Sequence, residues 1–246
     1  MPSLPDRTID LNADLGEGPG EEPLYALITS ANVACGGHAG DELTMRQAVR
    51  LALSHDVGIG AHPSYPDRER FGRVTMSISP AALSRSIAGQ TENLVRVAAT
   101  EGGRVTHVKP HGALYNDASR IEIARAIASG VASVSPLLVL VGLAGSPALQ
   151  VWKDLGFRVT AEGFADRAYA ADGTLAPRAR AGAVLTDPVA AAAQAIRLAT
   201  EGVCGTICVH ADTRGVAGIA AAVRRGLEDA GFALSSPALG NTRTGS

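Results

Sequence analysis

Residues 105–116 read VTHVKPHGALYN, and this stretch decides the fold prediction for the chain. It passes from a β-branched run to a cluster of basic and imidazole side chains, and then breaks at a proline and a glycine. If residues 105–109 form a strand, its two-residue period places His107, Lys109 and His111 on one face. Three such groups are costly to bury without a function, so we interpret them as one wall of a site.

Lys109 is conspicuous because lysine is rare in this chain. Of 22 basic residues, only Lys109 and Lys153 are lysine. An ammonium is more compact than a guanidinium, rotates its donors freely, and can lose its proton when it is buried. We therefore expect Lys109 to fill a role that arginine cannot.

The composition excludes several classes of function. With 246 residues, 46% hydrophobic residues and a net charge of −2, the chain has a globular composition and no basic field for nucleic acid or anionic lipid. No apolar run is long enough to span a bilayer and no signal peptide is visible, so we expect a cytoplasmic protein.

Three cysteines do not make a disulfide framework. Cys204 and Cys208 would lie about 13 Å apart along a strand, too far for a disulfide.

Strand and helix patterns alternate along the whole chain. The predicted strands are residues 8–15, 30–35, 57–62, 105–109, 137–141, 157–162, a weaker one at 183–185, and 206–210. The predicted helices are residues 42–55, 79–101, 117–132, 146–155, 187–201 and 214–231. Alternation of this kind predicts parallel pairing, and seven or eight units predict a TIM-like (β/α) barrel. We expect one domain over residues 1–246, with tails at 1–6 and 238–246.

Polar side chains recur where the predicted strands end. They are Asp14, His38, His62, Lys109 with His111, Glu162, and His210 with Asp212. The carboxyl ends of barrel strands form the active-site face, whereas a doubly wound sheet would gather polar groups at one switch point. The distribution over six strands favours the barrel.

The first predicted strand, TIDLNADL, carries two carboxylates and an amide on one face. Asp10, Asn12 and Asp14 alternate with apolar residues, so in a barrel they would point inward. The same spacing partly fits a calcium loop, but Leu15 stands where that loop requires glycine, and we reject this alternative.

Six longer strings resemble one known family. They are LNADLGEG, SANVACGGHAGD, GAHPSYPDRERFGR, VKPHGALYN, EGFADRAYAADGTLAPR and ICVHADT, and they occur between residues 8 and 234. They resemble the LamB/YcsF family, which includes the A subunit of bacterial ATP-dependent 5-oxoprolinase. The resemblance implies an irregular barrel of the glycoside hydrolase and deacetylase type. It also implies cleavage of 5-oxo-L-proline to L-glutamate with ATP hydrolysis, together with separate B and C subunits.

Lactam opening requires activation of a stable amide, which suggests roles for these residues. ATP could phosphorylate the amide oxygen, after which water attacks and an acid protonates the departing nitrogen. We assign Lys109 and Arg167 to the anionic phosphate or carboxylate, Asp14 or Asp10 to the general base, and His111 or His62 to the acid. The expected catalytic residues are Asp14, His62, Lys109 and His111. The expected substrate-binding residues are Asp10, Asn12, Asn32, His38, Glu162, Arg167, His210 and Asp212, with Glu162 and Asp212 orienting histidines or binding the substrate amine.

Two alternatives stay open, together with the location of ATP. A metal-dependent deacetylase or amidohydrolase would use Asp14, His38 and His62 as metal ligands. A non-catalytic subunit would only bind the substrate. ATP and Mg²⁺ are the expected co-substrates, but the glycine-rich segment 142–147 does not match a P-loop, so a partner could hold the nucleotide. Whether this chain binds a metal stays open.

Overall fold

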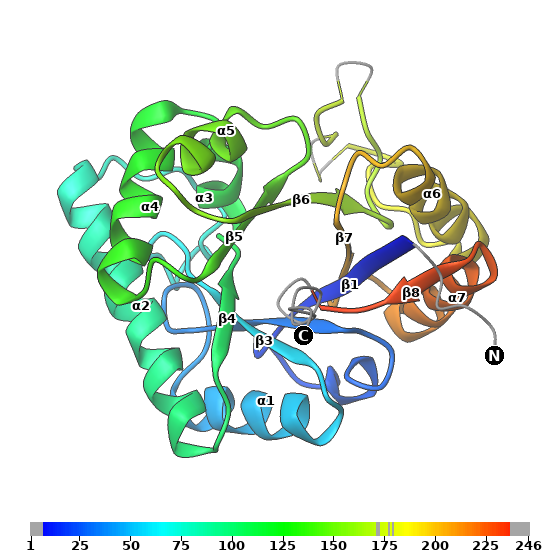
Figure 1. Cartoon of the computed structure of the whole chain (residues 1–246), viewed down its shortest axis with the longest axis horizontal. Helices are drawn as coiled ribbons and strands as arrows, with labels where there is room; N and C mark the ends of the chain where they lie inside the picture. The colour runs from blue at the N-terminus through cyan, green and yellow to red at the C-terminus, as the bar shows by residue number, and fades with distance from the viewer. Residues whose placement is uncertain (1–6, 171–172, 177, 179, 237–246) are drawn as a thin grey trace, which may run out of the picture.

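Parallel strands form a closed barrel in the computed structural model, which describes residues 7–170, 173–176, 178 and 180–236 (Figure 1). The strands are β1 (Arg7–Leu15), β2 (Ser30–Ala34), β3 (Gly58–His62), β4 (Val105–Val108), β5 (Val139–Leu143), β6 (Val159–Phe164), β7 (Thr206–His210) and β8 (Phe232–Leu234). Strands β2 to β7 pair in chain order, and β1 closes the barrel by pairing with both β7 and β2. The predicted TIM-like barrel is confirmed.

Strand β1 pairs with three other strands along its length. Its first residues, Arg7 to Ile9, pair with β8, and the segment from Asp10 onward pairs with β7. Its last residues, from Asn12 to Leu15, pair with β2. One strand therefore joins the two ends of the described chain.

Helices surround the barrel on the outside (Figure 1). They are η1 (Glu22–Leu24), α1 (Glu42–Ser54), α2 (Pro80–Thr100), α3 (Gly112–Asp117), α4 (Ile121–Val134), α5 (Pro147–Asp154), α6 (Pro188–Thr200) and α7 (Val216–Asp229). Asp41, Ser79, Ser146 and Asp187 each cap a helix through a side-chain oxygen that accepts from a backbone N–H in the first turn. No helix in the described ranges is long and apolar enough to cross a membrane.

The structure differs from the predicted elements in several places. The weak strand at 183–185 is not part of the barrel, because Val184 forms only an isolated antiparallel bridge with Arg167. The helix expected at 117–132 is α4, which begins at Ile121, and the short helix α3 before it was not predicted. The three-residue strand β8 was not predicted because its apolar pattern is too short. The predicted tails at 1–6 and 238–246 lie outside the described residues.

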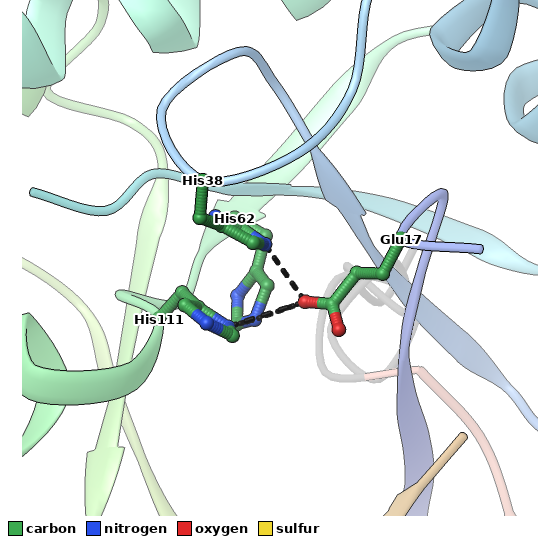
Figure 2. Close-up of side chains that lie close together, drawn as sticks. All are labelled: Glu17, His38, His62 and His111. Atoms are coloured by element: carbon green, nitrogen blue, oxygen red, sulfur yellow. Dashed lines mark hydrogen bonds and ion pairs between the residues drawn. The ribbon is translucent and has the colours of Figure 1, made fainter. Parts of the chain in front are cut away.

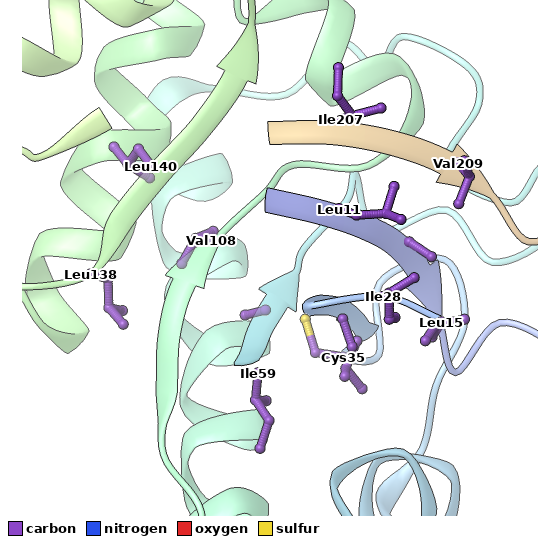
Figure 3. Packing of buried hydrophobic residues seen from close by; sticks show 14 of the residues in the cluster. Leu11, Leu15, Ile28, Cys35, Ile59, Val108, Leu138, Leu140, Ile207 and Val209 are labelled. Atoms are coloured by element: carbon purple, nitrogen blue, oxygen red, sulfur yellow. The ribbon is translucent and has the colours of Figure 1, made fainter. Parts of the chain in front are cut away.

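The apolar core lies between the barrel wall and the helices. Figure 3 shows Leu11, Val108, Leu140, Ile207 and Val209 among the buried side chains of this layer. Since side chains alternate along a strand, the opposite faces of the same strands point into the barrel. That interior is mostly polar, and it positions the site described next.

Candidate active site

Lys109 lies inside the barrel between two carboxylates. Its Nζ atom is 2.9 Å from Asp14 Oδ1 and 2.8 Å from Glu162 Oε1, and the side chain is only 2% exposed. It also donates to Asn12 Oδ1 at 3.3 Å and contacts Cys208 Sγ at 3.1 Å. Burial alone would lower the pKa of Lys109, but the facing acidic groups, led by Asp14, raise it well above its ordinary value. The ammonium therefore keeps its proton.

Two amides position these carboxylates. Asn32 Nδ2 donates to Asp14 Oδ1 at 2.9 Å and to Asn12 Oδ1 at 2.8 Å. Asn12 Nδ2 donates in turn to Glu162 Oε1 at 2.9 Å. His107 Nε2 lies 3.0 Å from Asn32 Oδ1, and burial lowers the pKa of His107 to about 3, so its neutral ring can donate to this oxygen. Asn12, Asn32 and His107 thus hold in place the two carboxylates that pair with Lys109.

Asp10 lies deeper in the barrel and does not line the cavity above Lys109. Its carboxylate accepts hydrogen bonds from the hydroxyl groups of Thr29, Ser30 and Thr206 at 2.5–2.8 Å. Burial raises the pKa of Asp10 from 3.8 to about 6, although these hydrogen bonds act in the opposite direction. Its position favours a structural role over that of general base, the alternative considered from the sequence.

A histidine cluster lies beside Asp14, and Figure 2 shows Glu17 pointing toward its three imidazole rings. Glu17 Oε1 is 2.8 Å from His38 Nε2, 3.2 Å from His111 Nδ1 and 3.6 Å from His62 Nε2. His62 Nε2 also lies 3.3 Å from Asp14 Oδ2. The cluster is thus linked directly to the carboxylate that holds Lys109.

Burial controls the protonation of this cluster. It lowers the pKa of His38 to about 4 and also lowers the pKa of His111, despite the nearby Glu17 carboxylate. Burial also disfavours charge on His62, but Asp14 and Glu17 outweigh it and raise the pKa of His62. Burial would raise the pKa of Glu17, yet hydrogen bonds from His111 and His38 hold it well below its usual range. An ionised carboxylate therefore faces two imidazoles that favour the neutral form, His38 and His111, and one that binds its proton more tightly, His62.

A cavity of about 440 Å³ opens above Lys109 at the carboxyl ends of the strands. Six of the predicted residues line it, namely Asp14, His62, Lys109, His111, Arg167 and His210. The remaining predictions lie elsewhere: Asn12, Asn32 and Glu162 support Lys109 from below, and His38 lies behind His111 with its ring stacked at 3.6 Å.

Three arginines, Arg73, Arg167 and Arg178, line this cavity. Arg73 donates to Asp212 at 2.8 Å, and Arg178 pairs with the same carboxylate. Arg167 donates to the carbonyl oxygen of Ala176 at 2.7 Å. Asp212 was expected to orient a histidine or bind a substrate amine, but in the structure it pairs with two arginines. Glu162, considered for the same role, pairs with Lys109.

His210 is oriented by Asp166, which was not predicted from the sequence. Asp166 is fully buried, and its Oδ1 atom lies 2.8 Å from His210 Nδ1. Its Oδ2 atom accepts from the His210 backbone N–H at 3.0 Å and from the Thr213 hydroxyl at 2.6 Å. Because Nδ1 is engaged, Nε2 is the ring nitrogen of His210 that is available to the cavity.

A larger cavity of about 930 Å³ lies between the loop after β1 and helix α1. Glu17 and His38 line it, but Lys109 and Asp14 do not. We place the candidate active site in the smaller cavity, because that cavity contains the paired charges. The Glu17 cluster lies between the two cavities.

Two groups of side chains in the described residues have the composition and spacing of metal sites. One is Glu17 with His38, His62 and His111, and the other is Asp14 with Cys208 and His210. The set expected from the sequence, Asp14 with His38 and His62, is therefore divided between two groups.

Comparison with known proteins identifies the family. A sequence model of the LamB/YcsF family matches residues 9–241. The chain belongs to the LamB/YcsF family. A relative from Chloroflexus aggregans, named as the A subunit of 5-oxoprolinase, is 44% identical over 94% of this chain and 99% of its own length.

Solved structures agree with this membership. The lactam utilization protein from Thermus thermophilus superposes with a TM-score of 0.87 at 39% identity, over 93% of this LamB/YcsF chain and 99% of that chain. A family 4 carbohydrate esterase from Streptomyces lividans superposes with a TM-score of 0.51 at 13% identity, over 94% and 93% of the two chains. The second likeness concerns the fold alone.

Proposed function

We propose that this chain is the A subunit of an ATP-dependent 5-oxoprolinase, which converts 5-oxo-L-proline to L-glutamate. Membership in the LamB/YcsF family and the 44% identical relative named as the A subunit of 5-oxoprolinase support the proposal. The observation that carries it is the cavity, which is lined by the buried Lys109–Asp14 ion pair and by three arginines. Such a cavity suits a small, anionic amide.

The arginines and Lys109 supply positive charge for the substrate. 5-Oxoproline carries a carboxylate, and its activated form also carries a phosphoryl group. Guanidinium groups bind both kinds of anion through paired N–H donors. Arg73, Arg167 and Arg178 line the cavity, and the substrate would compete with Asp212 and the Ala176 carbonyl oxygen for their N–H groups. Lys109 lies near the position of the lactam carbonyl in this proposal.

The proposed reaction uses ATP to overcome amide resonance. The γ-phosphoryl group moves to the lactam oxygen, and ADP leaves. Water then adds to the activated carbon, the C–N bond breaks as the nitrogen takes a proton, and an acyl phosphate of glutamate forms. A second water hydrolyses this acyl phosphate to glutamate and phosphate.

Residues of the cavity would provide the protons for these steps. His210, held by Asp166 at 2.8 Å, is the proposed donor to the departing nitrogen. Asp14 and the adjacent histidine cluster would orient the attacking water and receive its proton. Since burial raises the pKa of Asp14 but His62 and Lys109 hold it well below its ordinary value, Asp14 acts mainly by orientation. His62 and His111 thus act on the water in this scheme, and His210 takes the role of acid.

ATP, with Mg²⁺ as its counter-ion, would bind to the B and C subunits. The sequence has no P-loop, and the relatives are named as one subunit of a larger enzyme, which supports this division. Dependence on the intracellular ATP pool supports a cytoplasmic location.

The test is a reconstitution assay. Glutamate and phosphate release from 5-oxoproline and ATP should be absent with this chain alone and should appear once the B and C subunits are present. Omission of ATP should abolish both products. If the complete mixture released neither product, the proposed activity would be wrong.

A further inference from the structure

We propose that Glu17, His38, His62 and His111 form a binding site for one divalent cation of the zinc class. The spacing of their ligand atoms suits such an ion. Zinc holds nitrogen and oxygen ligands at about 2.0–2.1 Å in a tetrahedron, so neighbouring ligand atoms lie about 3.3 Å apart. The separations around Glu17 Oε1 are 2.8, 3.2 and 3.6 Å, and His62 Nε2 lies 3.0 Å from His111 Nδ1.

The direction of the ring hydrogens also favours a cation. His62 Nδ1 lies 2.7 Å from the Lys109 carbonyl oxygen, and His111 Nε2 lies 3.0 Å from the Phe71 carbonyl oxygen. A carbonyl oxygen only accepts, so both of these ring nitrogens carry hydrogen. In the neutral rings, the opposite nitrogens are then bare acceptors that face each other and the Glu17 carboxylate. Acceptors at this distance repel one another unless a cation lies between them, and that cation is either a proton on His62, whose pKa Asp14 and Glu17 raise, or a metal ion.

Hydrogen bonds to backbone carbonyls are also the usual support for metal-binding histidines, since they set the tautomer and the ring orientation. His38 adds a third ring to the same centre. Its Nδ1 atom is buried without a hydrogen-bond partner in the described part of the chain, so its polar contact is made by Nε2, which faces Glu17.

The site is held rigidly by the barrel. His62 is the last residue of β3, and the other members follow β1, β2 and β4, so all four lie at the carboxyl ends of neighbouring strands. The rings of His38 and His111 stack at 3.6 Å, and Phe71 packs edge-on against both at 5.1 and 5.4 Å. Parallel rings cannot both direct their in-plane lone pairs at one ion, so cation binding requires the ring of His38 or His111 to tilt out of the stack.

The neighbouring group of Asp14, Cys208 and His210 is not suited to a cation. The Lys109 ammonium already lies 2.9 Å from Asp14 and 3.1 Å from Cys208, so a second positive charge would be repelled. Burial also raises the pKa of the Cys208 thiol well above its ordinary value, which disfavours the thiolate needed for coordination. The proposed site is therefore the Glu17 cluster alone.

Cobalt provides the probe, because its visible absorption reports the coordination geometry. The full chain, stripped with a chelator, should take up one Co²⁺ and develop the intense visible bands of a four-coordinate site, and Zn²⁺ should abolish them. Glu17→Gln, His38→Gln and His111→Gln should each weaken Co²⁺ binding by roughly tenfold or more. Mutating a residue that only hydrogen-bonds to a metal ligand typically lowers metal affinity by about that factor, and removing a ligand itself should lower it at least as much. The exposed His55, changed to Gln, is the matched control and should leave binding unchanged.

Two further measurements make the result decisive. Zn²⁺ should raise the melting temperature of the unmodified chain but not that of Glu17→Gln, which separates a lost site from a misfolded variant. His210→Gln should keep the cobalt spectrum. Absence of micromolar Co²⁺ and Zn²⁺ binding, equal binding by Glu17→Gln, or loss of the spectrum only in His210→Gln would overturn the proposal. Metal binding is measured on this chain alone, so failure of the oxoprolinase assay would leave this result standing.

Discussion

At the scale of single residues, Lys109 compensates the charges inside the barrel. Asp14 and Glu162 both lie within 3 Å of its ammonium, and neither is exposed to enough water to be stable without a cation. The ammonium also contacts Asn12 and Cys208, so its partners surround it on several sides. A planar guanidinium could not make these contacts from the same position, which explains why lysine occurs here.

Lys109→Met keeps the length of the side chain but removes the charge. We expect a loss of about 3–5 kcal/mol in the free energy of unfolding at neutral pH, because two buried carboxylates lose their partner. Activity of the reconstituted complex should fall with it. Urea denaturation and the glutamate assay measure both effects, with the exposed Lys153→Met as the control. Equal behaviour of the two variants would contradict the assigned role.

Asp10 predicts a pH dependence of stability. Its pKa is about 6 in the folded chain and 3.8 when unperturbed, so the folded state binds the proton more tightly. The tighter binding of this proton stabilises the folded state fully below pH 3.8, and the stabilisation is lost as the pH rises through about 6. The unfolding free energy of the unmodified chain should fall relative to that of Asp10→Asn by about 3 kcal/mol across this window. A difference that stays flat, or grows with pH, would exclude this explanation.

At the scale of elements, the period of the strands predicted the inward-facing side chains well. Asp10, Asn12 and Asp14 of β1 point into the barrel because alternation is a local property of an extended chain. Glu17 and Asp166 could not be predicted in this way, since both lie beyond the ends of their strands. The chain turns at Gly16, whose φ is 75°, and after such a turn the strand period no longer predicts direction.

The long loop after β3 is anchored to two helices in the structure. Ser64 exchanges backbone hydrogen bonds with the Gln90 side chain at 2.9 Å, and the Tyr65 hydroxyl donates to Asp117 at 2.9 Å. The loop is therefore held by contacts with two helices, α2 and α3, that are distant from it in sequence. No local sequence pattern could have predicted these contacts.

Gly60 provides a test of the packing between β3 and β4. A side chain at this position would overlap the ring of His107, which supports Asn32. Gly60→Ala should therefore lower the unfolding free energy by about 1–3 kcal/mol. Gly89 lies inside α2, and nothing lies within 4 Å of an added methyl group. Because glycine destabilises a helix interior relative to alanine, Gly89→Ala should raise the unfolding free energy by roughly 0.5–1 kcal/mol. Thermal unfolding of both variants would show the predicted opposite signs, and equal signs would contradict this account.

At the scale of the whole molecule, the alternation of elements predicted a barrel but not how it closes. Closure depends on β1 pairing with β7 and β2, and on the additional strand β8 beside its first residues. These strand pairs join segments that are far apart in the sequence, and the hydrophobic pattern of one segment does not indicate which strand it pairs with. The side chains that converge on Lys109 could be predicted as a group, whereas their individual partners depended on this closure.

Closure supports the proposal that the chain is a single domain, and unfolding can test it. Trp152 is the only tryptophan, is fully buried in α5, and donates to the carbonyl oxygen of Ala124 at 2.9 Å. Its fluorescence and the far-ultraviolet circular dichroism of all the helices should change at the same urea concentration. Two separate transitions would indicate that part of the chain unfolds independently.

The position of β1 also has a consequence for synthesis. Thr206 of β7 is 196 residues from Asp10, to which its hydroxyl donates, and ribosomes add about 5–20 residues per second. A newly made β1 must therefore wait roughly 10–40 s for the strand that completes its pairing. During that time its inward-facing polar side chains have no barrel to enclose them. Folding of the nascent chain should be completed only near the end of translation, and the candidate active site should be among the last features to form.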